Sequence, residues 1–169
     1  MSEKARRIAL LGLLAALCFG LSYIELMLPA LPVGVPGIKA GLANICVVAA
    51  LYLLGAREAA AVNLIRIALN WLLFGSFTGL LYSLAGGALS FAAMLLLKKS
   101  GAFSPIGVSA LGGAAHNIGQ ICVAALLTGT PALVFYLPAL LIFGTAAGAL
   151  NGLIFTAIQA RLKPRGKKP

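Results

Sequence analysis

The sequence predicts an all-α integral membrane protein with six transmembrane helices in one domain, residues 1–169, and both termini in the cytoplasm. Three observations predict this class. The chain is 62% hydrophobic and only 9% charged, it contains six long apolar stretches, and its basic residues gather between alternate stretches. A soluble domain of 169 residues has too little interior to bury this much apolar surface.

The apolar stretches are 8–28, 40–54, 59–74, 78–97, 106–127 and 133–160. Each is long enough, or nearly so, to cross a hydrocarbon core of roughly 30 Å at about 1.5 Å per helical residue. The first stretch follows Lys4, Arg6 and Arg7, as the apolar part of a secretory signal would. No cleavage site before a soluble domain follows it, and five more stretches come after it. We therefore expect a retained first span.

The basic residues indicate the orientation. With the N-terminus inside, eleven of the 13 Lys and Arg residues fall on the cytoplasmic side. These are Lys4, Arg6, Arg7, Arg57, Lys98, Lys99, Arg161, Lys163, Arg165, Lys167 and Lys168. Lys39 lies in an outside loop and Arg66 within a span, so the chain follows the positive-inside rule. The net charge of +10 then points to anionic lipid headgroups rather than nucleic acid. We expect a multi-pass protein of a prokaryotic cell membrane.

The first outside loop, residues 29–39, is apolar but contains three prolines and two glycines. These residues exclude a helix there. An apolar, non-helical segment at a membrane needs cover from the protein. The loop is therefore either a lid or wall over a cavity that opens outside, or a stiff connector.

Two of the predicted spans carry rows of small residues. The rows are Gly144, Gly148 and Gly152 in the last span and Ala5, Ala9, Gly12, Ala16 and Gly20 in the first. Small side chains at this spacing let helix backbones approach closely in a membrane. Two interpretations stay open: packing of the rows within the bundle, or docking of another membrane subunit against the first helix. The face with Ala9, Gly12, Ala16 and Gly20 is the candidate subunit contact.

The third span carries a polar stripe. Asn63, Arg66 and Asn70 are spaced i, i+3, i+7 and fall within about a 60° arc. Arg66 is expected near the bilayer midplane, where an unpaired guanidinium costs at least about 2.5 kcal/mol. It needs an anion, several carbonyl groups or water. The alternatives are a structural pair with Glu25 and a site for an anionic ligand.

The fifth span has a second polar face. Its members are Ser109, Gly113, His116, Asn117 and Gln120. His116 is the chain's single histidine, and neighbouring glycines leave space beside it. It is interpreted as a hydrogen-bonded core residue, a ligand contact or a proton relay. A relay would need acidic partners, which are scarce in this chain.

The acidic residues limit the chemistry. The chain has no aspartate, and its glutamates are Glu3, Glu25 and Glu58, of which only Glu25 is expected within the outer half of the bundle. Paired carboxylates and G-x-x-x-x-G-K-[ST], H-E-x-x-H and G-x-S-x-G motifs are absent. The sequence therefore predicts a binding protein with no catalytic residues rather than an enzyme. Its basic groups and outer aromatic residues predict a pocket for a flat or isoprenoid-like molecule with an anionic end.

The cysteines predict neither a disulfide nor a metal site. Cys18, Cys46 and Cys122 all lie within spans, without C-x-x-C spacing or a place in a loop. We expect them to be small, buried hydrophobic residues.

Two motifs resemble signatures of a known family. Residues 37–45, GIKAGLANI, resemble its GxKxGLANI signature, which contains Lys39 and Asn44. FSPIGVS at 103–109, followed by HNIGQ at 116–120, resembles its second signature. Over about residues 8–160 the chain is similar to the Gx transporter family, also called heptaprenyl diphosphate synthase component I. That family in turn is similar to the substrate-binding S components of energy-coupling-factor (ECF) transporters.

The resemblance implies a six-helix protein that captures a substrate from outside under its first loop. It also implies that the first helix docks on a membrane scaffold (T-type) subunit, which carries two separate ATPases. Combined with the polar residues above, it gives a candidate ligand-binding set. The set is Glu25, Lys39, Asn44, Asn63, Arg66, Asn70, His116, Asn117 and Gln120.

The function implied is import of a small anionic or amphipathic molecule related to flavin, quinone or isoprenoid metabolism. The first alternative is a membrane subunit of flavin- and quinone-based extracellular electron transfer. Because the sequence has no haem-ligating histidine pair and no cysteine cluster, flavin or quinone would be held noncovalently. The second alternative is a non-catalytic component associated with polyprenyl diphosphate synthesis. A chain without aspartate lacks the carboxylates that bind Mg²⁺–diphosphate.

Overall fold

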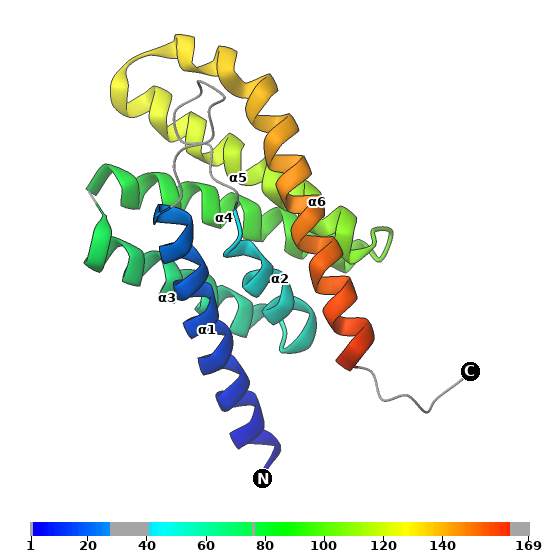
Figure 1. Ribbon diagram of the computed structural model, residues 1–169. Helices are drawn as coiled ribbons and strands as arrows, with labels where there is room; N and C mark the ends of the chain where they lie inside the picture. Colours follow the sequence, from blue (N-terminus) through cyan, green and yellow to red (C-terminus); the bar gives the residue numbers. More distant parts are fainter. Residues whose placement is uncertain (1, 28–40, 76, 163–169) are drawn as a thin grey trace.

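The computed structural model describes residues 2–27, 41–75 and 77–162, and these form an all-helical bundle (Figure 1). The predicted loop 29–39, with Lys39, lies outside the described residues. The elements are α1 (Glu3–Met27), α2 (Asn44–Leu53), α3 (Ala56–Phe74), α4 (Phe77–Ser100), α5 (Pro105–Thr128), the 3-10 helix η1 (Pro131–Tyr136) and α6 (Leu137–Leu162). The predicted all-α class is confirmed for these residues.

Four of the helical segments are long and apolar enough to cross a membrane: Glu3–Glu25, Phe77–Ser100, Pro105–Thr128 and Pro131–Arg161. The prediction of six spans is not confirmed. A helix was expected over 40–54, but α2 has only 10 residues and is about 15 Å long at roughly 1.5 Å per residue. An apolar run of this length is typical of a buried core helix.

The core surrounds α2, which contacts α1, α3 and α6. Val47, Val48 and Leu51 of α2 are at most 1% exposed and pack with Val62 of α3 and Phe155 of α6. Burial on several sides explains why α2 is apolar all round. A short turn at Gly55, whose φ is +124°, joins α2 to α3 and brings α3 back beside α2.

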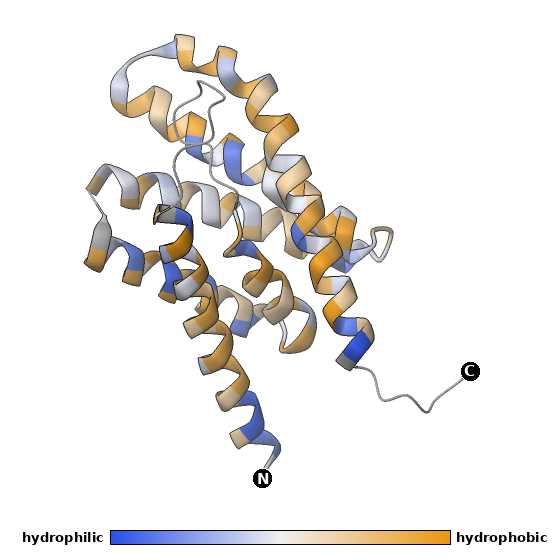
Figure 2. Cartoon of the chain, viewed as in Figure 1, coloured by the Kyte–Doolittle hydropathy of each residue, from blue (hydrophilic) through white to orange (hydrophobic). Residues whose placement is uncertain are grey.

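Charged side chains close the end of the bundle where α2 ends. The guanidinium of Arg7 donates to the Leu54 carbonyl at 2.8 Å and pairs with Glu58 at 3.2 Å. Lys98 donates to the Leu51 carbonyl at 2.5 Å. These cations satisfy carbonyl groups that a helix C-terminus leaves without partners. Figure 2 shows hydrophilic residues at the start of α1 and the end of α6, with hydrophobic residues over most of the helices between.

Helices α4, α5 and α6 approach each other closely at glycines. A β-carbon on Gly119 of α5 would lie 2.6 Å from the Ala85 carbonyl of α4. A β-carbon on Gly152 of α6 would lie 2.6 Å from the Cα of Ile106. The row Gly144, Gly148 and Gly152 therefore packs within the bundle, against α5.

The small-residue row of α1 has the opposite surroundings. Ala9, Gly12 and Ala16 are exposed, and a β-carbon on Gly12 or Gly20 would meet none of the described residues within 4 Å. Internal packing therefore does not account for this row. One further expectation is wrong, because Cys122 is exposed on α5 whereas Cys18 and Cys46 are buried as predicted.

Candidate ligand-binding cavity

A cavity of about 290 Å³ lies among all six α-helices. Its lining comes from the later halves of α1 and α3, the first halves of α2 and α4, and the middle of α5 and α6. It therefore lies away from the end of the bundle that Arg7, Glu58 and Lys98 close. Gly113 of α5 and Gly144 of α6 both line it, at a point where the backbones of these two helices are in close contact.

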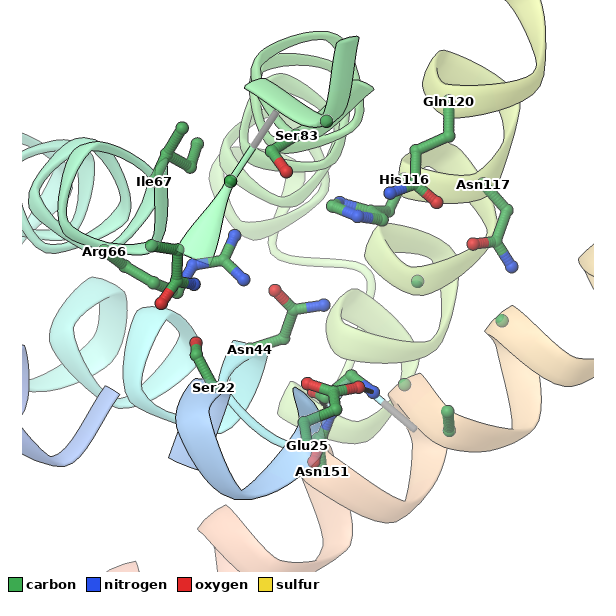
Figure 3. Close-up of a pocket in the computed structure, with 18 of the residues that line it drawn as sticks. Ser22, Glu25, Asn44, Arg66, Ile67, Ser83, His116, Asn117, Gln120 and Asn151 are labelled. Carbon is green, nitrogen blue, oxygen red and sulfur yellow. Dashed lines mark hydrogen bonds between the residues drawn. The ribbon is translucent and has the colours of Figure 1, made fainter. Parts of the chain in front are cut away.

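Most of the predicted ligand-binding residues meet at this cavity. The predicted members in its lining are Glu25, Asn44, Arg66, Asn70, His116, Asn117 and Gln120. Figure 3 shows Arg66 on one side and His116 with Gln120 on the other, with Asn44 between them. Lys39 lies outside the described residues, and Asn63 does not line the cavity. Polar residues from four predicted spans thus converge, as the cost of exposing them to lipid requires.

Asn63 lies behind Arg66 and holds its guanidinium. The Asn63 amide donates to the Gly87 carbonyl of α4 at 3.2 Å, and its oxygen accepts from Arg66 Nη2 at 2.9 Å. Gly87 makes this possible, because a β-carbon there would lie 3.1 Å from the Asn63 amide nitrogen and 2.9 Å from Ile67. Asn63 itself is absent from the cavity lining, so it orients Arg66 from behind, and its predicted contact with a ligand stays a prediction.

Glu25 and Arg66 do not form an ion pair within 4.0 Å. Among the described residues the one ion pair within 4.0 Å joins Arg7 to Glu58. Glu25 instead accepts a hydrogen bond from the backbone N–H of Gly41. The Gly41 carbonyl accepts from Asn151 of α6 at 2.7 Å. Glu25 and Asn151 therefore anchor the backbone that enters α2, at a residue whose φ of +66° suits glycine.

The wall opposite Arg66 is also built by close packing. Asn117 donates to the Leu140 carbonyl at 2.6 Å, which fixes its amide against α6. A β-carbon on Gly86 of α4 would lie 2.9 Å from His116 and from Gln120. Glycine at that position therefore makes room for both side chains beside the cavity.

Three buried polar atoms at the cavity have no hydrogen-bond partner among the described residues. They are Ser22 Oγ, Arg66 Nε and Asn70 Oδ1. Each such atom costs about 1–3 kcal/mol when it is left without a partner. Atoms of this kind mark a place where something else completes the bonding.

Several lining residues were not predicted. Ser22, Ser83 and Asn151 all line the cavity. Asn151 had a usable signal, because an asparagine inside an apolar span is costly unless it faces the interior. Ser22 lies one helical turn before Glu25, on the same face of α1. No group of three or more His, Cys, Asp or Glu side chains able to hold a metal occurs among the described residues.

The profile of a family described as heptaprenyl diphosphate synthase component I matches residues 14–158. No curated protein and no solved structure shows a significant match. The matched segment contains every described residue of the cavity lining.

Proposed function

Because this chain belongs to the heptaprenyl diphosphate synthase component I family, we propose that it is a substrate-binding membrane subunit of the energy-coupling-factor type. Its ligand is a small anionic or amphipathic molecule related to flavin, quinone or isoprenoid metabolism. The ligand occupies the cavity between α3 and α5, and flavin or quinone would be held there without a covalent bond.

The environment of Arg66 carries the proposal. Its guanidinium lies beside the cavity with one bond to Asn63 and no carboxylate within 4.0 Å among the described residues. A cation inside a membrane protein persists where an anion, a dipole or water compensates it. The amide side chains around the cavity supply dipoles, and an acceptor or anionic group on a ligand completes the compensation.

The size of the cavity favours a compact ligand. Its volume of about 290 Å³ lies at the lower end for small-molecule pockets. A heptaprenyl chain has roughly 35 carbons; if each carbon takes about 30 Å³, which is the volume of one water molecule in the liquid, the chain needs several times the volume of this cavity. We infer that the family name refers to an association with prenyl diphosphate synthesis rather than to a polyprenyl chain held in this cavity.

The carboxylates favour binding over catalysis. Glu58 is paired with Arg7 at the far end of the bundle, and Glu25 is the one acidic residue in the described cavity lining. Acid–base chemistry with two carboxylates would need a second one within reach. The site thus supports recognition and release of a ligand.

The charge at one end of the bundle supports an orientation in the membrane, and the open face of α1 supports a partner subunit. We propose that the basic end with Arg7 and Lys98 faces the cytoplasm of a prokaryotic cell, as the positive-inside rule requires. Both ends of the chain then lie inside. The open face of α1 would dock on a scaffold subunit with two ATPases, because small side chains permit close helix contact.

The test is recovery of ligand with variants of Arg66. Protein with Arg66→Gln should retain about 10-fold less of a co-purifying small molecule than the wild type, since a hydrogen bond to a charged group contributes about 1.5–3 kcal/mol. Mass spectrometry of the extracted molecules measures this. Arg57→Gln is the matched control, because Arg57 is an exposed arginine of the same helix.

Equal recovery from wild type and Arg66→Gln would reject the site. A structural role predicts something else: Arg66→Gln would lower the melting temperature and Glu25→Gln would restore it. Since no ion pair joins these two residues, we expect no such rescue.

A further inference from the structure

We propose that the ligand presents a hydrogen-bond acceptor next to a hydrogen-bond donor, as in the –CO–NH– edge of a lactam or imide ring, to the α1 and α3 wall of the cavity. The inference rests on the proposed function and names the chemical class of its ligand. It comes from the three polar atoms that have no partner at this wall: Ser22 Oγ, Arg66 Nε and Asn70 Oδ1.

These three atoms differ in whether they donate or accept a hydrogen bond. Arg66 Nε–H can only donate, whereas Asn70 Oδ1 can only accept. The serine hydroxyl does either. Arg66 and Asn70 are four residues apart on α3, so their side chains are neighbours on one face. A molecule that satisfies both carries an acceptor and a donor, and because the two side chains are neighbours we place these two groups side by side on the ligand.

The orientation of Arg66 makes this demand specific. Asn63 Oδ1 accepts a hydrogen bond from Arg66 Nη2 at 2.9 Å, and the Asn63 amide in turn donates to the Gly87 carbonyl. The Nε edge of the guanidinium is therefore held in place without a partner. Ser22 Oγ, Arg66 Nε and Asn70 Oδ1 are all buried, so bulk solvent does not serve these three atoms. A small rotation of each side chain toward a bound ligand would give its unpartnered atom about one hydrogen bond.

The pattern separates the three ligand chemistries. A quinone ring and a prenyl diphosphate offer oxygen acceptors but no N–H donor beside them. The flavin ring has an imide edge in which an N–H lies between two carbonyl groups. That edge accepts from Arg66 and donates to Asn70, and a nearby cation also stabilises charge on its oxygens. The wall therefore favours a compact heterocycle with an imide or lactam edge over a quinone.

The experiment uses three probes that differ at this edge: lumiflavin, 3-methyllumiflavin and menadione. The methyl group replaces the hydrogen on the imide nitrogen, which removes the donor and leaves the rest of the ring unchanged. Trp71 is the chain's single tryptophan and lines the cavity, so its fluorescence reports binding to the full-length protein in nanodiscs. Lumiflavin should bind at least about 10-fold more tightly than 3-methyllumiflavin, because the methyl form leaves a buried acceptor unpaired. Menadione should bind as weakly as the methyl form, or more weakly.

Asn70→Leu should remove the preference by weakening lumiflavin to the level of the methyl form. Gln159→Leu is the control, because it removes an amide of α6 that does not line the cavity. Should Asn70→Leu fail to fold, the comparison of the two flavins on the unchanged protein still decides.

Equal affinity of the two flavins would overturn the proposal, since a bound water would then satisfy the wall instead. Failure of both flavins beside tight menadione binding would also overturn it. A co-purifying molecule without an N–H next to a carbonyl would do the same. The last two outcomes leave the proposed function intact, because ligand recovery with Arg66→Gln tests that function without any assumption about the ring.

Discussion

Gly12, Ala16 and Gly20 in α1 follow the same four-residue spacing as the glycine row of α6, Gly144, Gly148 and Gly152. The α6 row lies against the backbone of α5, so that a β-carbon on Gly152 would be 2.6 Å from Ile106. The α1 row meets none of the described residues at Gly12 or Gly20. Equal spacing therefore has two different uses in one bundle.

The difference shows what such a row specifies. Small side chains permit close approach of a second helix, but the spacing does not say which helix. In α6 the second helix is part of the chain, and its contact also places Asn117 and Gly113 at the cavity wall. In α1 the row remains available to lipid or to another subunit. Substitutions that add one methyl group, either to α5 where it packs against its neighbouring helices or to the α1 row, test this directly.

The largest effect is expected for Gly113→Ala. Its added β-carbon would collide with the Gly144 carbonyl, a backbone atom that cannot rotate away. We expect a loss of about 3 kcal/mol or more in unfolding free energy, at the upper end for overpacking. Thermal melting of the protein in a fixed detergent measures this.

Gly119→Ala provides an independent check on the other side of α5, since its β-carbon would lie 2.6 Å from the Ala85 carbonyl. Unchanged melting of both variants would mean that α5 is not packed against α4 and α6 as described.

The next effect concerns assembly rather than folding. Ala16→Trp places a large ring on the open face of α1, where Ala16 is exposed. If this face contacts a partner subunit, recovery of the complex should fall at least about 10-fold while melting of the isolated chain changes little. Affinity purification from the native membrane, with the partners quantified, gives the measurement.

Leu17→Trp is the matched control for Ala16→Trp. Leu17 is also exposed on α1, at 50%, but points about 100° away from Ala16. Equal loss of partners from both variants would show a general effect of bulk on α1 rather than a specific face. Full recovery from both would leave the row facing lipid.

Much of the site was predictable because the membrane restricts where polar side chains lie. Arg66, His116 and Gln120 sit in apolar stretches, and exposure to lipid is costly for each. Any arrangement of the helices that avoids this cost brings them together. The spacing of Asn63 and Arg66 also predicted one face correctly, since they are hydrogen-bonded at 2.9 Å.

Other features depend on contacts between distant segments. The apolar run at 40–54 does not reveal that α2 is short, since a buried core helix and a span have the same composition. The bond from Asn63 to the Gly87 carbonyl holds this residue behind Arg66, outside the cavity lining. Glu25 accepts from the backbone of Gly41 rather than from Arg66. These outcomes depend on tertiary geometry that spacing along the chain does not encode.

The smallest effect is expected for Gly12→Ala, the counterpart of Gly113→Ala in the open row. The new methyl group meets none of the described residues within 4 Å, so no contact is strained. Alanine also lowers the entropy lost when the helix forms, by roughly 0.5–1 kcal/mol relative to glycine. The isolated chain should therefore melt at the same temperature or slightly higher, under the detergent conditions used for Gly113→Ala. A destabilisation comparable to that of Gly113→Ala would show that α1 is packed against another part of this chain at Gly12. The two rows would then have the same use, and the subunit contact proposed for α1 would lose its basis.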